Sequence, residues 1–261
     1  MKDTSQYPYT LFLVGAGADD GGWTPVIKAI NKTINKTGGT TQIQHPEDAN
    51  FYLAQHVYER RMCAAIKRRH GSHSPENIAQ QEKDGEIRDR VLKTAIADHL
   101  KEATSLGALK LRAEFLKTIN DPQFGRNKVF LTANWDLLLE RELKSSAKVH
   151  HIHGTVSDPD NLFLPSETTQ EDYRSAEQYK AMGGQLATLW QTVASAERIC
   201  IFGLSLSPLD AELTFAISTG INHKPGFKRR ITIIALPKDI DSIKVRIMLL
   251  SEHSTDLIFD P

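Results

Sequence analysis

Glycines and hydrogen-bonding side chains directly follow four short apolar runs of the sequence. The first run ends in Gly15-Ala16-Gly17. After a buried strand, the first glycine of such a pair allows a tight turn, and the second lets the backbone approach a pyrophosphate. A helix that begins next would point its N-terminus at the phosphates. Asp20 stands where the dinucleotide-binding pattern has its third glycine, so this segment alone also fits an ordinary turn between a strand and a helix.

Asn134 and Asp136 follow the second run, in the segment FLTANWDLLLER (130–141). Polar side chains just beyond the carboxyl end of a parallel strand lie where open α/β sheets bind ligands. The alternative interpretation is that one of these two side chains caps the helix that is predicted for the following residues.

His153 and Gly154 follow the third run, in a segment with histidines at 150, 151 and 153. A histidine at a strand end can project into a cleft, and its near-neutral pKa suits proton transfer. A histidine in the core is the competing interpretation. The histidines have no cysteine or acid at a suitable spacing, so we do not expect a metal site.

The fourth run ends in Gly203, and the serines after it offer hydroxyl groups that could hold a ribose or a phosphate. These are Ser205 and Ser207. Ser207 precedes Pro208, so we expect it to cap a helix over Leu209–Ser218.

The apolar runs predict an α/β fold with a Rossmann-like, doubly wound parallel sheet. The runs are rich in β-branched or aromatic residues, and helical patterns separate several of them. One such helix is expected from Asp239 to Leu250. The expected strands are Thr10–Val14, Lys128–Thr132, His150–Ile152 with its neighbours, Ile199–Phe202, Ile231–Leu236 and, as a sixth candidate, Asp256–Phe259.

Residues from about 49 to 119 carry no strand signal, and they predict a helical subdomain inserted into a single domain of residues 1–261. Apolar residues recur there at helical spacing. The polar segment 68–86 between the two helical patterns is expected to be a loop. About 70 residues are too many for an ordinary connection, and we expect them to cover a cleft.

A second irregular segment runs from Thr155 to about Tyr173 and is rich in acids, proline, serine and threonine. Such a loop after a strand is often functional, although it also fits a long surface connection. The segment AMGGQ (181–185) is expected to interrupt the helix that follows.

Composition describes an ordinary soluble protein, with 40% hydrophobic and 25% charged residues. The formal net charge of +0 gives no reason to expect binding to nucleic acid or to an anionic membrane. No apolar run approaches the ~20 residues that span a bilayer, and the N-terminus lacks an apolar signal region. Cys63 and Cys200 are too few for a zinc site of four thiolates. We therefore expect a cytoplasmic protein without a metal.

In their order, the motifs GAG, T-x-N-x-D, H-G and G-x-S-L resemble those of the sirtuin (silent information regulator) family over nearly the whole chain. The closer similarity is to the sirtuin-like NAD-consuming proteins of prokaryotic antiviral defence. The segment LPSETTQEDY (164–173) also resembles the acidic stretch that follows His-Gly in such proteins. The resemblance implies an NAD glycohydrolase that releases nicotinamide and ADP-ribose and depletes NAD in defence against phages.

The resemblance also implies a role for each matching position. Asn134 would place the attacking nucleophile beside the nicotinamide ribose. Asp136 would hydrogen-bond the nicotinamide carboxamide, and His153 would be the general base. The positions implied in binding NAD are Gly15, Ala16, Gly17, Ala18, Thr132, Asn134, Asp136, Gly203, Ser205 and Leu206.

Departures from the deacylating sirtuins favour NAD cleavage over protein deacylation. The paired cysteines of their zinc ribbon are missing, Ala133 replaces a glutamine, and the segment ADDGGWTPV (18–26) lacks their arginine. Nicotinamide is a good leaving group, so a site that orients the ribose and delivers water would suffice. A deacylase or ADP-ribosyltransferase of the sirtuin type and a non-catalytic NAD sensor are the alternatives. An ordinary Rossmann oxidoreductase is disfavoured, because no clear acid at a strand end follows the glycines by ~20 residues.

An enzyme that depletes NAD has to be held in check, and the sequence shows no obvious sensor domain. The resemblance therefore implies control by homo-oligomer assembly or by a separate partner, such as a nucleic-acid-sensing protein or an ATPase. The helical insertion and the acidic loop are the expected surfaces for assembly or for a lid.

Overall fold

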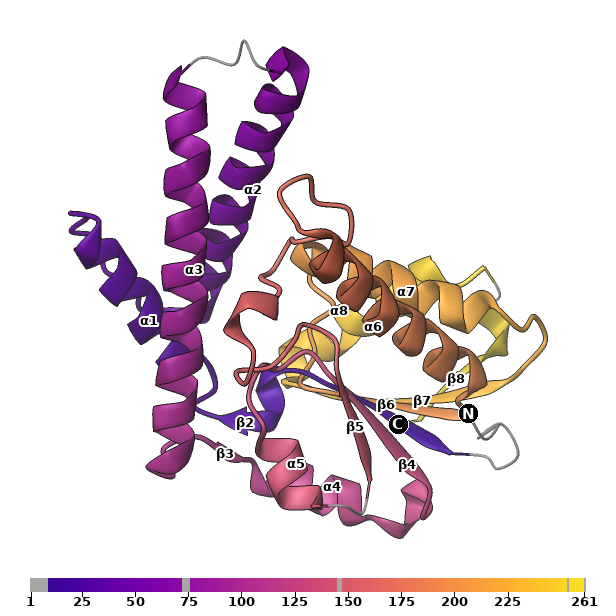
Figure 1. Ribbon diagram of the computed structural model, residues 1–261. Coiled ribbons are helices and arrows are strands. Elements are labelled where there is room, and N and C mark those ends of the chain that lie inside the picture. Colours follow the sequence, from indigo (N-terminus) through magenta and orange to yellow (C-terminus); the bar gives the residue numbers. More distant parts are fainter. Residues whose placement is uncertain (1–8, 72–75, 145–146, 253, 261) are drawn as a thin grey trace.

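A six-stranded parallel sheet organises the chain in the computed structural model, which describes residues 9–71, 76–144, 147–252 and 254–260 (Figure 1). The strands lie in the order β5-β4-β1-β6-β7-β8. Numbered along the chain, this is the Rossmann order 3-2-1-4-5-6, so the prediction of a Rossmann-like α/β fold is confirmed. The strands are β1 (Thr10–Val14), β4 (Lys128–Thr132), β5 (Lys148–His151), β6 (Arg198–Phe202), β7 (Arg229–Ile234) and β8 (Leu257–Phe259).

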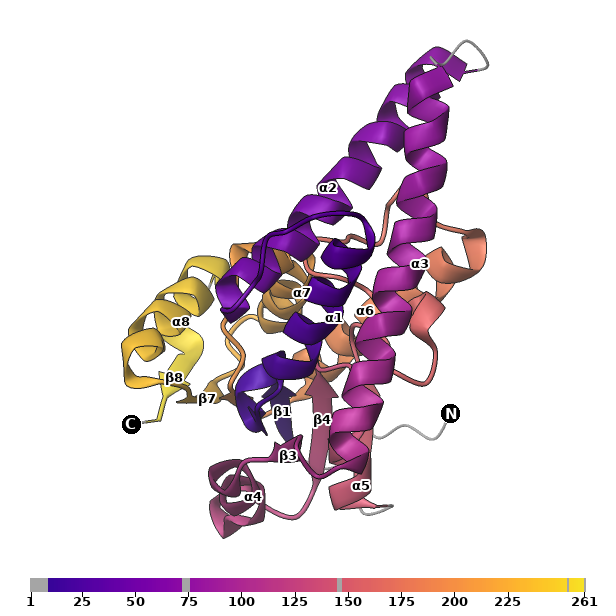
Figure 2. The same ribbon diagram turned by 90° about the vertical axis from the view of Figure 1, so that its left-hand side faces the viewer.

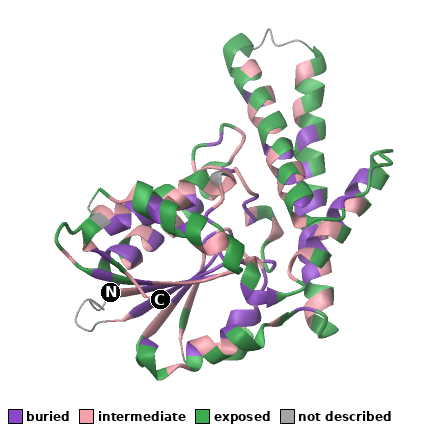
Figure 3. Cartoon of the chain, turned by 180° about the vertical axis from the view of Figure 1, so that it is seen from behind, coloured by how far each residue is buried: buried purple, intermediate pink, exposed green. Residues whose placement is uncertain are grey.

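Helices cover both faces of the sheet, because successive side chains of a buried strand point to opposite faces. In β1, Leu11 and Leu13 pack into one apolar core, and Phe12 and Val14 pack into the core on the other face. Figure 3 shows the strands buried between these helical layers. Helices α6 (Ala176–Ser195), α7 (Ala211–Asn222) and α8 (Pro237–Leu250) cover the first face, and α4 (Ala113–Asn120) and α5 (Leu138–Leu143) cover the second.

Three helices between β1 and β4 share an apolar core, to which α5 and the loop after β5 also contribute. They are α1 (Trp23–Lys36), α2 (Pro46–His70) and α3 (Glu76–Ser105). Helices α2 and α3 lie side by side and project from the rest of the protein as a hairpin (Figures 1 and 2). Buried side chains such as Leu53 and Ile96 lie toward the base of this hairpin. That residues 49–119 form a separate inserted subdomain stays a prediction.

A short two-stranded sheet connects the turn after β1 to the end of the helical segment. Its strands are β2 (Asp19–Asp20) and β3 (Lys110–Leu111), which pair antiparallel. The expected loop after β5 is present: residues 155–175 are irregular apart from the 3₁₀ turn Pro159–Asn161.

Helix α3 begins inside the polar segment that we expected to be a loop. Residues 68–70 belong to α2, the helix α3 starts at Glu76, and residues 72–75 lie outside the described part of the chain. The expectation of a loop over 76–86 is therefore wrong. The segment is polar but rich in glutamate, glutamine and lysine, which have high helix propensity.

Helix α6 continues through Gly183-Gly184, so the expected interruption is also wrong. Each glycine costs a helix roughly 1 kcal/mol relative to alanine. Two features offset this cost. Ser175 and Gln178 form a capping box at the first turn, and Leu189 and Val193 are buried against α7.

The segment after β6 begins its helix slightly later than expected. A 3₁₀ turn over Pro208–Asp210 precedes α7, which starts at Ala211 and not at Leu209. The Ser207 hydroxyl accepts a hydrogen bond from the Leu209 N–H at 3.2 Å, so the expected capping role of this serine is confirmed.

Arg229 is buried at the start of β7 and is 1% exposed. Its guanidinium donates hydrogen bonds to the carbonyl oxygens of Ala194 at 3.1 Å, Gly220 at 3.4 Å and Ile221 at 2.6 Å. These oxygens lie in the last turns of α6 and α7, where carbonyl groups have no partner within the helix. Arg229 therefore attaches the ends of both helices to the sheet.

Replacing Arg229 with methionine should lower the free energy of unfolding by about 3 kcal/mol, because it leaves buried carbonyl groups without donors. Urea denaturation followed by circular dichroism measures this. Arg230→Met is the matched control: Arg230 is exposed, and its nearest carboxylate oxygen on Asp260 is 3.9 Å away. Equal losses in the two variants would contradict the anchoring role.

Candidate functional site

The strand order reverses between β1 and β6, and the backbone turns after these two strands are in direct contact. Gly15 N–H donates to the Phe202 carbonyl at 3.0 Å, and Gly17 N–H donates to the Gly203 carbonyl at 3.0 Å. A Cβ atom on Gly203 would lie 2.5 Å from the Gly17 backbone, and one on Gly17 would lie 2.6 Å from Gly203 Cα. The glycines of two predicted motifs therefore meet at the position where Rossmann sheets bind ligands.

The segment after these glycines differs from the expected turn into a helix. Residues Ala16–Ala18 form a 3₁₀ turn, strand β2 follows, and α1 begins at Trp23. The N-cap residue of α1 is Gly22, and no side chain caps this helix. Neither Asp19 nor Asp20 therefore caps α1. The helix also does not start directly at the glycine turn, because β2 intervenes.

Asn134 connects the ends of β1 and β4. Its Nδ2 donates to Asp19 Oδ2 at 2.7 Å and lies 3.4 Å from the Gly15 carbonyl oxygen. Its backbone N–H donates to Thr132 Oγ1 at 3.0 Å. The structure thus brings three predicted site residues together. It adds Asp19, which is not among the site residues predicted from the sequence.

Asp136 and Asp19 form a pair of buried carboxyl groups, 6% and 3% exposed. Asp136 Oδ1 accepts the N–H of Leu138, the first residue of α5, at 2.9 Å. The N-cap residue of this helix is Leu137, however, so neither Asn134 nor Asp136 is its N-cap. Burial, the negative charge of Asp136 and a hydrogen bond between the two carboxyl groups raise the pKa of Asp19 to about 9, against the opposing charge of Arg112. The surroundings of Asp19 therefore favour its neutral form.

His151 holds the backbone of Asn134. Its Nδ1 lies 2.8 Å from the Asn134 carbonyl oxygen, and its Nε2 lies 2.5 Å from Glu140 Oε1. Burial opposes the charged imidazole, but the hydrogen bond and the charge of Glu140 outweigh it and raise the pKa of His151. Sequence analysis assigned no role to His151, because its partner on α5 follows only from the fold.

His153 lies in a second polar cluster. Its side chain is 13% exposed, and its nearest charged partner is Asp210, with Nε2 3.9 Å from Oδ1. Within the described ranges neither ring nitrogen has a hydrogen-bond partner, and none joins His153 to Asn134. Burial lowers the pKa of His153, although the charges of Asp210, Glu167 and Glu212 oppose this.

A small cavity adjoins His153, with a volume of about 10 Å³. That is room for about one water molecule. A neutral imidazole beside such a site is suited to accept a proton. The other lining residues are Ile152, Glu167, Met182, Leu186, Asp210, Glu212 and Leu213.

The segment from Gly203 to Leu206 is held in a strained conformation by α8. Leu206 has a φ of 49°, in the left-handed region that bulky residues rarely adopt. Arg246 Nη1 donates to the carbonyl oxygens of Ser205 at 2.5 Å and Leu206 at 3.3 Å. Strain of this kind persists where surrounding contacts enforce it and is common at ligand sites. Arg246 was not singled out from the sequence.

The loop of residues 155–175 covers His153 and is connected to the α2–α3 hairpin by ion pairs to two buried glutamates. Phe163 N–H donates to the His153 carbonyl at 3.0 Å. Glu167, whose side chain is 1% exposed, lies 3.3 Å from both Lys93 Nζ and Arg174 Nη2. On α2, Arg61 Nη2 lies 2.5 Å from Glu171 Oε1. Buried charges of this kind need such partners, so the loop and the hairpin form one network.

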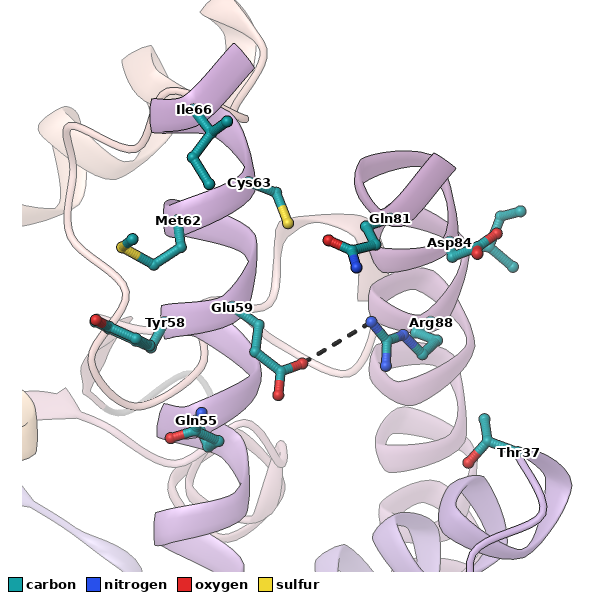
Figure 4. A pocket seen from close by; sticks show the side chains of 11 residues that line it. Thr37, Gln55, Tyr58, Glu59, Met62, Cys63, Ile66, Gln81, Asp84 and Arg88 are labelled. Atoms are coloured by element: carbon teal, nitrogen blue, oxygen red, sulfur yellow. Dashed lines mark ion pairs between the residues drawn. The ribbon is translucent and has the colours of Figure 1, made fainter. Parts of the chain in front are cut away.

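A larger groove of about 770 Å³ lies between α2 and α3 (Figure 4). Glu59 and Cys63 point from α2 toward α3, and Glu59 Oε2 lies 3.9 Å from Arg88 Nη2 between the helices. None of the residues predicted to bind NAD lines this groove. The groove is therefore separate from the glycine turns.

Two kinds of feature are absent from the described residues. No group of three or more His, Cys, Asp or Glu side chains in them could hold a metal ion. No helix in the same ranges has the length and apolar character that crossing a membrane requires.

The fold and the turns define a Rossmann-like α/β protein with a candidate ligand site where the strand order reverses. No protein-family model matches the chain, and no curated protein matches it. The assignment to NAD chemistry therefore rests on the motifs and on the arrangement of the residues that carry them.

Replacing Gly203 with alanine should destabilise the protein by more than about 3 kcal/mol, because the new methyl group meets backbone atoms and the φ is +60°. Urea unfolding measures the loss. Gly226→Ala is the matched control, since Gly226 has a φ of +77° but open space around its Cβ position. We expect about 1 kcal/mol there from the backbone alone. Equal losses would show that the contact between the turns is unimportant.

Proposed function

We propose that this chain is an NAD glycohydrolase of the sirtuin-like type, acting as an NAD-depleting effector of antiviral defence in the cytoplasm. One observation carries the proposal: the Gly15-Ala16-Gly17 turn contacts Gly203 where the strand order reverses, with Asn134 at the same edge. Dinucleotides bind at this position in Rossmann sheets. The order of the four motifs along the chain indicates that this dinucleotide is NAD.

The proposed reaction breaks the bond between the nicotinamide nitrogen and C1′ of the ribose. Nicotinamide leaves with the bonding electron pair, a water oxygen forms the new bond to C1′, and His153 accepts the water proton. The products are nicotinamide, ADP-ribose and a proton. Asn134 would hold the water or a ribose hydroxyl, and the pyrophosphate would lie over Gly17, which is exposed. Orientation and exclusion of other nucleophiles supply most of the rate enhancement.

The loop of residues 155–175 would act as the lid of this site. In the present arrangement it covers His153, and Lys93 and Arg61 of the hairpin hold it through Glu167 and Glu171. A second copy of the chain, or a separate sensor or ATPase that binds the hairpin, would release the loop. The closed loop would therefore keep the basal rate of NAD cleavage low until assembly raises it.

A non-catalytic NAD sensor is the second candidate function. The observation that favours it is the closed loop, which leaves only 13% of the His153 side chain exposed. A sensor would bind NAD tightly and leave it intact. The enzyme assay below separates the two functions.

Purified protein incubated with NAD should release nicotinamide, measured by liquid chromatography. Asn134→Ala and His153→Ala should each reduce the rate by about 100-fold or more, the range for a lost catalytic group. The control variants are Asn120→Ala and His70→Ala, which change exposed side chains on α4 and α2 and should leave the rate unchanged.

The products and the variants decide between the candidates. Acetyl-ADP-ribose from an acylated peptide would favour a deacylase over a hydrolase. Tight NAD binding without turnover would favour the sensor. NAD cleavage that survives both substitutions would refute the assignment of the site.

Arg61→Met should loosen the loop, because it removes the ion pair to Glu171 and the hydrogen bond to the Ser166 carbonyl at 2.9 Å. We expect faster amide hydrogen exchange in residues 163–174, measured by mass spectrometry, and a higher rate of NAD cleavage. Arg69→Met, at the exposed end of α2, is the control. Unchanged exchange in the Arg61 variant would contradict the role of the hairpin in holding the loop.

A further inference from the structure

The two ends of the Asn134 side chain have different surroundings. The amide nitrogen donates to Asp19 Oδ2 at 2.7 Å and lies 3.4 Å from the Gly15 carbonyl oxygen. An amide NH₂ group has two hydrogens, and both thus have acceptors in the protein. The carbonyl oxygen Oδ1 is the end left to face a ligand. Of the two hydrogen bonds that select this orientation of the amide, the one to Asp19 is the shorter.

Asp19 is itself part of a carboxyl pair. The Oδ1 atom of Asp19 is buried and receives no hydrogen bond from the described residues. The Asp19 carboxyl group as a whole has the carboxyl group of Asp136 as its hydrogen-bonding neighbour. Two ionised carboxylates cannot form a hydrogen bond, so one of the pair must hold a proton. A proton on Asp19 Oδ1 would let this otherwise unpartnered atom donate to Asp136.

Two further charged groups decide whether Asp19 keeps that proton. Asp136, in the segment between β4 and α5, favours the neutral acid through its negative charge. Arg112, directly after β3, opposes it and donates from Nε to the Asp19 carbonyl oxygen at 3.1 Å. Burial is the largest contribution and favours the neutral form, which places the pKa of Asp19 at about 9.

We propose that Asp19 is a positioning residue: as a neutral acid it accepts from Asn134 and donates to Asp136, and so holds Asn134 Oδ1 toward the water that attacks the ribose. The part about the water rests on the proposed function. The arrangement of Asp19, Asn134 and Asp136 does not, and it can be tested without NAD.

Substitutions of Asp19 can distinguish the contribution of its proton from the contribution of its shape. In Asp19→Asn, the new amide oxygen can accept from Asn134 and the new NH₂ can donate to Asp136, as the neutral acid does, at every pH. Asp19→Ala removes both contacts. Asp20→Asn is the matched control, since Asp20 is the exposed neighbour on the same short strand.

The first experiment measures stability against pH, by urea unfolding at pH 5, 7 and 9. Because the folded pKa of about 9 exceeds the ordinary value of 3.8, the stabilisation from the Asp19 proton is complete below pH 4, falls as pH rises and is lost above pH 9. Asp19→Asn lacks this loss. Its stability relative to the wild type should therefore increase from pH 5 to pH 9, whereas Asp20→Asn should show no trend. A stability difference between Asp19→Asn and the wild type that does not change with pH would overturn the proposal.

The second experiment measures NAD cleavage by the wild type and the Asp19 variants. Asp19→Ala should lower kcat by about 100-fold with KM little changed, because a misplaced catalytic group costs about this much. Asp19→Asn should keep most of the kcat and should lose the fall in rate that the wild type shows near pH 9. Equal losses in both variants, or none in Asp19→Ala, would overturn the positioning role.

The two experiments distinguish failure of this inference from failure of the proposed function. If the wild type does not cleave NAD, the proposed function fails, and the stability experiment alone decides whether Asp19 is the neutral partner of Asn134 and Asp136. If the wild type cleaves NAD and the stability difference is flat, the enzyme assignment stands and the Asp19 proposal fails.

Discussion

The close contact between two glycine turns is the constraint on which the candidate site depends. Gly17 and Gly203 touch through backbone atoms, with no space for a side chain on either residue. This contact fixes the end of β1 against the end of β6. The Ala133 N–H, which donates to the Val14 carbonyl at 2.9 Å, then fixes the end of β4 beside them. The amide of Asn134 reaches its partners because these three strand ends cannot shift relative to one another.

The protein neutralises its buried carboxyl groups in two different ways. Burial and the negative charge of Asp136 together favour the protonated form of Asp19. Glu167 is paired with two cations, Lys93 and Arg174. A buried charge without compensation is costly, so either solution is acceptable in a protein interior. The two solutions respond to different changes: the first to pH, the second to movement of the elements that carry the cations.

The sheet could be predicted from the sequence, because each strand is a short buried run and helical patterns separate the runs. The meeting of Asn134 with Gly15 also follows from that pattern, since parallel strands end at a common edge. The partner of Asn134 could not be predicted in this way. Asp19 lies 115 residues away along the chain, and its carboxyl group turns inward because β2 pairs with β3. The same holds for Lys93 and Glu167, 74 residues apart, whose pairing requires the hairpin and the loop to be folded together.

The position of Lys93 along the α2–α3 hairpin determines how a movement of the hairpin would act on the ion pair with Glu167. At 1.5 Å per residue, Lys93 stands about 10 Å along α3 from the buried Leu100, whereas the first residue of that helix, Glu76, stands about 36 Å from it. If the hairpin turns about its packed base, a force at the tip is multiplied between three- and four-fold at Lys93, by the ratio of these approximate lengths. With such a turn, the hairpin would act as a lever whose short arm carries the contact to Glu167. A weak pull at the exposed end would then act as a stronger one on the loop next to His153.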